Sequence, residues 1–202
     1  MSLAPTRFLA IALSTVAISP ALAETANYKV DAVHSTVLFK IQHFGAGNFY
    51  GRFNGFDGTI VHDEADASKN AITLNIKADS IDTANAKRDD HVKGPDFLNV
   101  AQFPTITFKS KEVKKVDDKN FELTGDVTLH GVTKPVTAKV EVTGKGKDPK
   151  GGERAGAEAK FTLKRSDFGM NYMPGALGDE IGVIVALEAT KEAAAPKPAA
   201  GN

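Results

Sequence analysis

The sequence contains no cysteine among its 202 residues. Disulfide bonds, thiol catalysis, thiolate metal sites and lipid attachment to a cysteine are therefore excluded. A net charge is also absent, because 25 basic residues balance 25 acidic ones. Binding to nucleic acid needs basic groups that meet the phosphate backbone, so this balance argues against such a partner. Long apolar runs are missing too, and no segment after the N-terminal one could span a membrane.

The first 23 residues have the organisation of a signal peptide. Arg7 is their only charge, and the apolar run Phe8–Ile18 follows it. This run falls short of the ~20 residues that cross a bilayer. Pro20 and Ala21-Leu22-Ala23 then give the small-x-small pattern that signal peptidase recognises. We expect cleavage after Ala23 and export to the periplasm, where a chain without disulfides must rely on its core alone.

Apolar and polar residues alternate through the rest of the chain. In one segment Val37, Phe39 and Ile41 fall on one face, with Thr36 and Lys40 on the other. A period of two predicts β-strands. Segments of this kind predict eight strands over residues 36–42, 48–63, 72–77, 105–109, 121–129, 136–142, 157–164 and 181–187. Short turns make sequential strands antiparallel neighbours, and eight strands can close into a barrel around a packed core or one small ligand. A β-sandwich with a dry core is the alternative.

Three glycines interrupt the longest predicted strand, residues 48–63. They are Gly51, Gly55 and Gly58. Glycine inside a strand often marks a bulge or a sharp bend, and a closing barrel requires such bends. We therefore expect local irregularity at all three positions.

Residues 80–98 break the strand pattern. Asn85 suits the N-cap of a helix over residues 85–93, and Gly94-Pro95 would stop that helix. Pro95 also suits the first position of a second short helix. Positions four apart share a helix face, so Arg88 should lie beside Val92. We predict a helical insert that crosses one end of the barrel.

Five motifs, in order along the chain, carry a resemblance to a known family. They are Tyr28-Lys29-Val30-Asp31 with His34-Ser35, Ser80-Ile81-Asp82-Thr83 with Arg88-Asp89 and His91, residues 103–110 (FPTITFKS), residues 125–134 (GDVTLHGVTK) and residues 165–170 (RSDFGM). With these motifs the chain resembles the YceI-like family. The resemblance implies an exported, lipocalin-like, eight-stranded antiparallel barrel over residues 24–190. It further implies a polyisoprenoid or similar amphiphile as ligand, with no cofactor and no established catalytic residue. Residues 191–202, rich in Ala, Pro and Lys, are expected to form a disordered tail.

The apolar interior and the polar mouth of such a barrel would have different roles in ligand binding. Burying one five-carbon isoprene unit is worth up to roughly 3–4 kcal/mol, whereas a hydrogen bond to a head group nets only ~1 kcal/mol. The interior should therefore set affinity, and the mouth should set orientation and selectivity. We predict ligand contacts from the strands (Phe39, Phe53, Ile72, Leu74, Ile76, Phe108, Phe121, Leu123, Phe161 and Leu163), from the insert (Arg88, Asp89, His91 and Phe97) and from the segment after residue 165 (Phe168 and Met170). The alternative for the apolar set is an ordinary packed core.

Two other functions compete with lipid carriage or storage. One is a periplasmic enzyme acting on a lipid or small hydrophobe, with an acid–base pair drawn from Asp89, His91 and Asp167. The other is a carrier of an isoprenoid quinone for a membrane redox partner, which differs only in cargo and docking. The histidines lack the two-His spacing of metallohydrolases, so no metal is expected. Transient contact with a membrane or a membrane protein for loading, and a homodimer, stay open as partner hypotheses.

Overall fold

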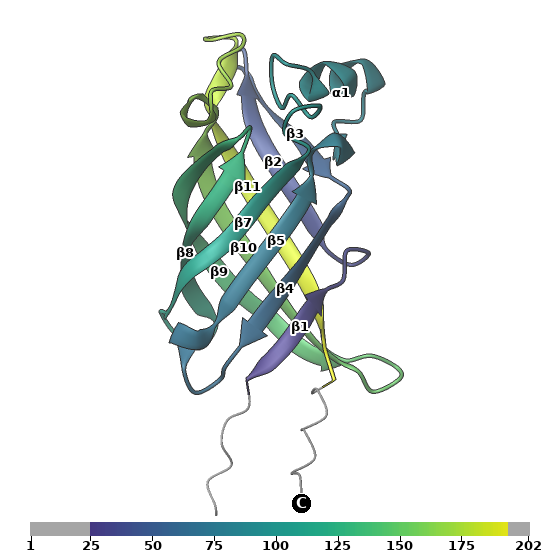
Figure 1. Ribbon diagram of the computed structural model, residues 1–202, viewed down its shortest axis with the longest axis vertical. Helices are drawn as coiled ribbons and strands as arrows, with labels where there is room; N and C mark the ends of the chain where they lie inside the picture. The colour runs from purple at the N-terminus through teal and green to yellow at the C-terminus, as the bar shows by residue number, and fades with distance from the viewer. Residues whose placement is uncertain (1–24, 194–202) are drawn as a thin grey trace, which may run out of the picture.

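A computed structural model describes residues 25–193, which form one closed barrel of antiparallel strands (Figure 1). The predicted signal peptide, residues 1–23, and residues 194–202 of the predicted tail lie outside the described residues. The barrel extends slightly into the segment expected to be tail. Its last strand reaches Lys191, and the backbone N–H of Glu192 donates to the carbonyl of Asn27 at 2.7 Å.

Eight strand positions make up the ring, which confirms the predicted eight-stranded barrel and excludes the sandwich. Two positions are each divided into two shorter strands that follow one another along the wall. In chain order the strands of the ring are β1 (Ala26–Val30) continued by β2 (Thr36–His43), β3 (Gly47–Phe53) continued by β4 (Phe56–His62), β5 (Ala71–Lys77), β7 (Thr105–Lys115), β8 (Asn120–Leu129), β9 (Val132–Lys147), β10 (Glu153–Lys164) and β11 (Leu177–Lys191).

The last strand closes the ring onto the first. β11 is long enough to pair with β2 over its first part and with β1 at its end. Val185 lies opposite Val37, and Ala189 lies opposite Val30. Because every strand is antiparallel to its neighbours, short hairpins suffice for most connections. Because the number of strand positions is even, the described residues begin and end at the same end of the barrel, and the insert lies at the other end (Figure 1).

The long predicted strand over residues 48–63 bends once, at Asn54–Gly55. There the N–H of Asn54 donates to Ser80 C=O at 3.0 Å, and Gly55 C=O accepts from Lys77 N–H at 2.8 Å. A Cβ on Gly55 would lie 3.1 Å from the Cβ of Ser80, so the insert packs directly on this bend. The expected irregularity at Gly51 and Gly58 is wrong, because both lie in regular strand pairings. A close approach explains each instead, with the ring of Phe39 at Gly51 and Thr73 C=O at Gly58.

The insert, residues 78–104, crosses the upper end of the barrel in Figure 1. It contains the two-residue strand β6 (Ile81–Asp82), which pairs with β3, and the helix α1 (Ala86–Lys93). The Oδ1 of Asn85 accepts from the Arg88 N–H at 3.1 Å, as predicted for an N-cap. The second helix expected from Pro95 is absent from this described segment, where turns follow α1. Within residues 25–193 no helix is long and apolar enough to cross a membrane. Three short 3-10 helices complete the fold, η1 (Ala67–Lys69), η2 (Ala78–Ser80) and η3 (Arg165–Phe168).

Two clusters of buried apolar residues fill different parts of the barrel. The larger cluster runs beneath the insert and includes Leu98 and Phe168. The smaller one joins Leu123, Ala138 and Val140 near the end opposite the insert. Most residues of the larger cluster surround an unfilled space beneath the insert, and this space is the candidate functional site.

Candidate functional site

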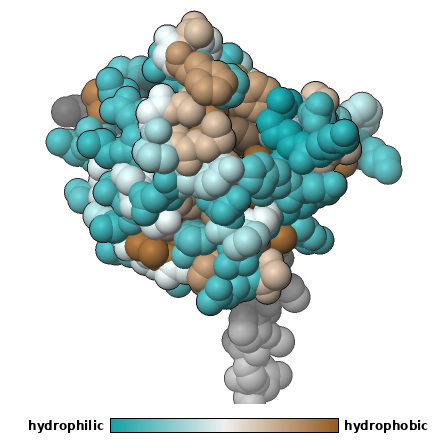
Figure 2. Space-filling view, turned by 90° about the horizontal axis from the view of Figure 1, so that it is seen from above, coloured by the Kyte–Doolittle hydropathy of each residue, from teal (hydrophilic) through white to brown (hydrophobic). Residues whose placement is uncertain are grey.

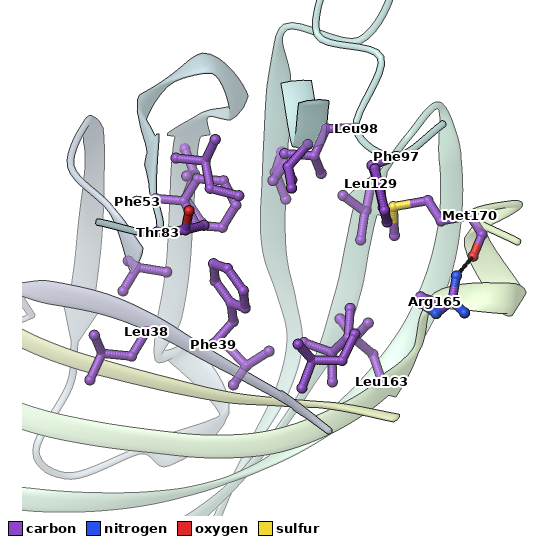
Figure 3. A pocket seen from close by; sticks show the side chains of 18 of the residues that line it. Leu38, Phe39, Phe53, Thr83, Phe97, Leu98, Leu129, Leu163, Arg165 and Met170 are labelled. Carbon is purple, nitrogen blue, oxygen red and sulfur yellow. Dashed lines mark hydrogen bonds between the residues drawn. The ribbon is translucent and has the colours of Figure 1, made fainter. Parts of the chain in front are cut away.

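A cavity of about 350 Å³ lies inside the barrel at the end covered by the insert. That volume falls within the range of ~300–1,000 Å³ typical of small-molecule sites. Figure 3 shows side chains from different strands, among them Phe39, Leu129 and Leu163, directed into one common space. We call its opening the mouth, which lies between the insert (residues 78–104) and the segment 165–178. Most lining residues are apolar, and the polar exceptions are His43, Thr83, Arg88, His91, Thr107 and Arg165.

Phenylalanine rings lie along the cavity wall instead of filling the space. The ring of Phe39 covers Gly51 on the adjacent strand, where a Cβ would come within 2.6 Å of its Cε1. The ring of Phe108 covers Gly125 in the same way, with a Cβ 2.6 Å from its Cζ. Both rings remain only partly buried although they face inward. Two glycines thus leave room at the wall for the tips of two rings, and this arrangement keeps the interior hollow.

A hydrogen-bonded group at the mouth ties α1 to the strand β6. The carboxylate Oδ1 of Asp89 accepts from the backbone N–H of Thr83 at 2.8 Å and from its hydroxyl at 2.5 Å. Arg88 donates from Nε to Thr83 Oγ1 at 2.8 Å and from Nη2 to Thr83 C=O at 2.5 Å. The Arg88 guanidinium also lies 4.3 Å from the centroid of the Phe49 ring. Arg88 therefore both fixes the insert and presents a cationic group to the cavity, while Asp89 contacts only the insert.

Arg165 organises the other side of the mouth. Its side chain is 5% exposed and donates only to backbone carbonyls in the segment that follows it. The acceptors are Met170 and Tyr172 at 2.7 Å each, Gly178 at 3.0 Å, Leu177 at 3.3 Å and Met173 at 3.5 Å. A guanidinium offers five N–H donors in a rigid fork, and here they shape a loop that lacks regular hydrogen bonding.

The turn at η3 has two further anchors. Ser166 donates from its backbone N–H and its hydroxyl to the carboxylate of Asp179, at 3.0 and 2.8 Å. The Ser166 hydroxyl and then its N–H hold the pKa of Asp179 below its ordinary value. His130 Nδ1 lies 2.9 Å from the carbonyl of Phe168, and its Nε2 is buried with no hydrogen-bond partner among the described residues. Because Phe168 is fully enclosed by this arrangement, it supports the mouth without lining the cavity.

Three aromatic rings join the insert to segment 165–178 across the mouth. His91 and Phe97 come from the insert, and Tyr172 comes from the segment opposite. Each pair of rings meets edge to face, with centroids 5.2 to 5.3 Å apart. His91 Nε2 also lies 3.0 Å from the Asp96 carboxylate. Such contacts are individually weak, about 0.5–1.5 kcal/mol per pair beyond area burial. They can therefore close the mouth and still open reversibly.

The structure brings most of the predicted ligand contacts together at this cavity. Those that line it are Phe39, Phe53, Leu74, Ile76, Arg88, His91, Phe97, Phe108, Phe161, Leu163 and Met170. The predicted contacts outside the lining are Ile72, Asp89, Phe121, Leu123 and Phe168. Ile72, Phe121 and Leu123 face inward, but they belong to the packed cluster at the opposite end. Alternation indicates the inward face and not the level along the barrel axis, so it did not separate these three residues from those that line the cavity.

Other lining residues were missed by the sequence reasoning. Val37, Ile41, Val183 and Val185 belong to inward stripes, so their strand phase already carried the signal, whereas Ile81 lies in the segment that breaks the strand pattern. The buried guanidinium of Arg165 had no such signal, because only the fold reveals its carbonyl partners. Further lining residues that were not predicted are Leu38, His43, Phe49, Thr83, Val92, Leu98, Ile106, Thr107, Val127, Leu129, Met173, Leu177 and Ile181.

The acid–base group of the enzyme hypothesis is not assembled. Among the described hydrogen bonds, none joins Asp89, His91 and Asp167 to one another. Asp89 is satisfied by Thr83, His91 contacts Asp96, and Asp167 is exposed. A general base must lie within hydrogen-bond reach of the group that it serves, and this trio offers no such pair at the cavity.

Asp31, His34 and Glu188 have ligand-capable atoms within 4.8 Å of one another, outside the cavity lining. Arg154 Nη1 already lies 2.8 Å from Asp31 Oδ2 and 2.5 Å from Glu188 Oε1. The hydrogen bonds from His34 and Arg154 hold the pKa of Asp31 well below its usual range. The Arg154 guanidinium bridges the two carboxylates and occupies the position that a metal ion would take, so this group is an ion-pair network where β1 meets β11.

A family model described as the YceI-like domain matches residues 28–189. The chain belongs to the YceI-like family. A UPF0312 protein of Pseudomonas aeruginosa strain UCBPP-PA14 is 42% identical over 185 residues, covering 91% of this chain and 96% of that protein. Protein YceI of Escherichia coli O17:K52:H18 is 40% identical over 186 residues, covering 91% and 97%.

Solved structures share the fold of this YceI-like chain. Burkholderia cenocepacia BcnA superposes with a TM-score of 0.72 at 23% identity, covering 79% of this chain and 98% of BcnA. A polyisoprenoid binding domain from Saccharophagus degradans superposes with a TM-score of 0.63 at 15% identity, covering 85% and 100%. At these identities the likeness establishes the barrel alone.

Several of the YceI-like motifs meet at the mouth in this structure. Ser80–Thr83 with Arg88 and Asp89 forms the network that anchors the insert. The RSDFGM motif, residues 165–170, forms η3 and its exit, and His130 from residues 125–134 contacts it. Segments distant in sequence thus converge to frame one opening.

Proposed function

We propose that this protein binds a polyisoprenoid or isoprenoid-quinone-like amphiphile in the periplasm, for carriage or storage. The observation that carries the proposal is an apolar cavity whose polar groups gather mainly at its mouth. The structurally similar domain from Saccharophagus degradans is a polyisoprenoid binding domain, and together with membership of the YceI-like family this supports the choice of ligand class. The chain would keep the apolar tail from water, with the head group near Arg88, Thr83 and His91.

The size of the cavity sets how much of a tail it can hold. At ~30 Å³ per water-sized group, the space accepts about a dozen methylene-sized groups, or two to three isoprene units. Their burial is worth up to roughly 3–4 kcal/mol per unit. Association costs about 4–15 kcal/mol. Two to three buried units therefore offset only the lower part of that cost, and binding should be reversible, as carriage requires.

Chain length provides a direct test of this accounting. With prenyl alcohols of increasing length, affinity should rise steeply up to about three isoprene units and then level off. Isothermal titration in a mild detergent measures the series. Affinity that keeps rising beyond four units would contradict this accounting.

Native mass spectrometry of protein purified from its own periplasm, followed by organic extraction, tests the function itself. We expect a co-purifying prenyl lipid. A matched pair of variants controls for adventitious lipid. Leu163→Arg places a charge in the cavity, whereas Thr162→Arg places it on the outer face of the same strand. Lipid should be lost from the first variant and kept by the second. Equal retention by both folded variants, or no lipid in the wild type, would contradict the proposal.

A further inference from the structure

The rim of the mouth is divided into an uncharged half and a charged half. Residues 41–51 and residues 168–178 contain no Asp, Glu, Lys or Arg, in a chain where these types make up 25%. At that frequency about five charged residues would be expected over the two stretches together. The opposite side of the mouth, residues 82–96, carries charges at Asp82, Lys87, Arg88, Asp89, Asp90, Lys93 and Asp96. Viewed from above, hydrophobic residues gather beside the opening and strongly hydrophilic ones lie across from them (Figure 2).

The two uncharged stretches form one continuous surface. The backbone N–H of Phe44 donates to the carbonyl of Ala176 at 2.7 Å, and His43 pairs with Leu177. His43 and Leu177 also line the cavity. We call this surface, residues 41–51 with 168–178, the uncharged rim. It leads directly from solvent to the cavity.

Phe44 projects from the tip of the uncharged rim in a strained conformation. Its side chain is 63% exposed, and its φ is 52°. Gly45 follows with a φ of 66°, and Ala46 N–H donates to His43 C=O at 3.0 Å, the pattern of a type I′ turn. Asn is strongly preferred at the position that Phe44 occupies, whereas a bulky residue there is an outlier. The ring of the adjacent His43 contacts it, with centroids 4.2 Å apart, but most of the Phe44 side chain remains exposed. An exposed ring held in a strained conformation is available for a contact outside the molecule.

We propose that the uncharged rim docks onto the surface of a neutral lipid bilayer, with Phe44 entering the interface and the charged half of the mouth remaining in water. This inference rests on the proposed function, since it supplies the route by which a lipid enters without crossing water. Uncharged segments can enter an interface without desolvating a charge. Tyr172, 39% exposed, and Tyr50, 55% exposed on the same rim, suit the headgroup level.

The dimensions of the rim favour a bilayer over a second protein chain. One projecting phenylalanine and two tyrosines bury ~150–250 Å² each at most. Because these side chains are only 39–63% exposed, the area they can still bury falls short of the ~800 Å² that each partner contributes to a standard protein interface. A bilayer needs no complementary surface. The described chain also begins and ends at the other end of the barrel, so the rim is oriented away from both ends (Figure 1).

Tryptophan fluorescence tests the docking directly, because the chain contains no tryptophan. Phe44→Trp places one reporter at the rim. Val116→Trp is the matched control, since Val116 is 64% exposed in the β7–β8 turn at the opposite end. With phosphatidylcholine vesicles we expect a blue shift, and quenching by brominated acyl chains, for Phe44→Trp alone. No change in it, equal changes in both variants, or a concentration-dependent shift without vesicles, which would indicate a second copy, overturns the proposal.

Phe44→Asn separates docking from folding and from ligand binding. Asn suits the left-handed position, so the melting temperature should be unchanged or higher. Transfer of a fluorescent prenyl lipid from vesicles should slow by about tenfold or more, given what one buried phenylalanine contributes. Binding of the same lipid from detergent should stay unchanged. Unaltered transfer would overturn docking and leave the proposed function standing. Wild-type protein that binds no prenyl lipid from detergent would defeat the proposed function, while the tryptophan variants still report on docking.

Discussion

The two ends of this barrel are built from the same alternating strands, yet one is packed and the other is hollow. At the packed end Leu123 and Ala138 are 4% and 2% exposed, and neighbouring strands supply side chains that meet across the interior. At the hollow end the tips of the Phe39 and Phe108 rings lie over glycines, and the insert replaces a full-length strand wall. The comparison shows that strand alternation decides which side chains face inward. The size of those side chains and the continuity of the strand wall decide whether they meet across the barrel or leave a cavity.

The largest expected effect comes from truncating the packed end. Leu123→Ala should lower the free energy of unfolding by about 2–5 kcal/mol, because it removes a buried side chain from a filled cluster. Leu163→Ala, which borders existing empty space, should cost much less and should weaken ligand binding instead. Urea denaturation and lipid binding measured on both variants would distinguish the ends. Similar costs for the two would mean that the hollow end is packed in solution.

A smaller effect is expected from filling the space that Phe39 uses. Gly51→Ala places a Cβ within 2.6 Å of the Phe39 Cε1, so the ring must move into the cavity. Overpacking of this kind costs about 1–3 kcal/mol and should reduce the length of lipid accepted. Gly47→Ala on the same strand is the control, since nothing lies within 4 Å of its Cβ and its φ is not positive. Loss of long-chain binding in both variants would argue against a specific role for the ring.

Removal of the Arg88 side chain tests whether the charged half of the mouth only holds the insert in place or also contacts the ligand. Arg88→Ala deletes two hydrogen bonds to Thr83 and the contact with Phe49, and should cost about 1–2 kcal/mol. If Arg88 only anchors the insert, melting temperature falls while lipid is retained. If it also contacts the head group, the free energy of lipid binding is weakened by more than the free energy of unfolding. Lys87→Ala, exposed on the same helix, provides the baseline.

The smallest effect is a pH dependence at the mouth. The pKa of Asp179 is lowered by hydrogen bonds from Ser166, so the folded protein binds this proton less readily than the unfolded chain. The stabilisation is therefore complete above the unfolded value of about 3.9 and is lost as pH falls through the lower folded pKa. Amide exchange in residues 166–178 should increase below about pH 4 in the wild type. In Asp179→Asn the exchange should be faster already at neutral pH and should respond less to acid.

The sequence by itself determined the strand count, the antiparallel order, the helical insert with its Asn85 cap and the family. These features depend on local spacing, because a period of two and a capping side chain act within a few residues. Only the tertiary structure decided which inward residues border empty space. Ile72 and Leu74 share one strand face, yet Ile72 packs at the closed end and Leu74 lines the cavity. The distance across the barrel depends on ring closure, on which rings lie over glycines and on where the insert crosses, and each of these joins residues far apart in the chain.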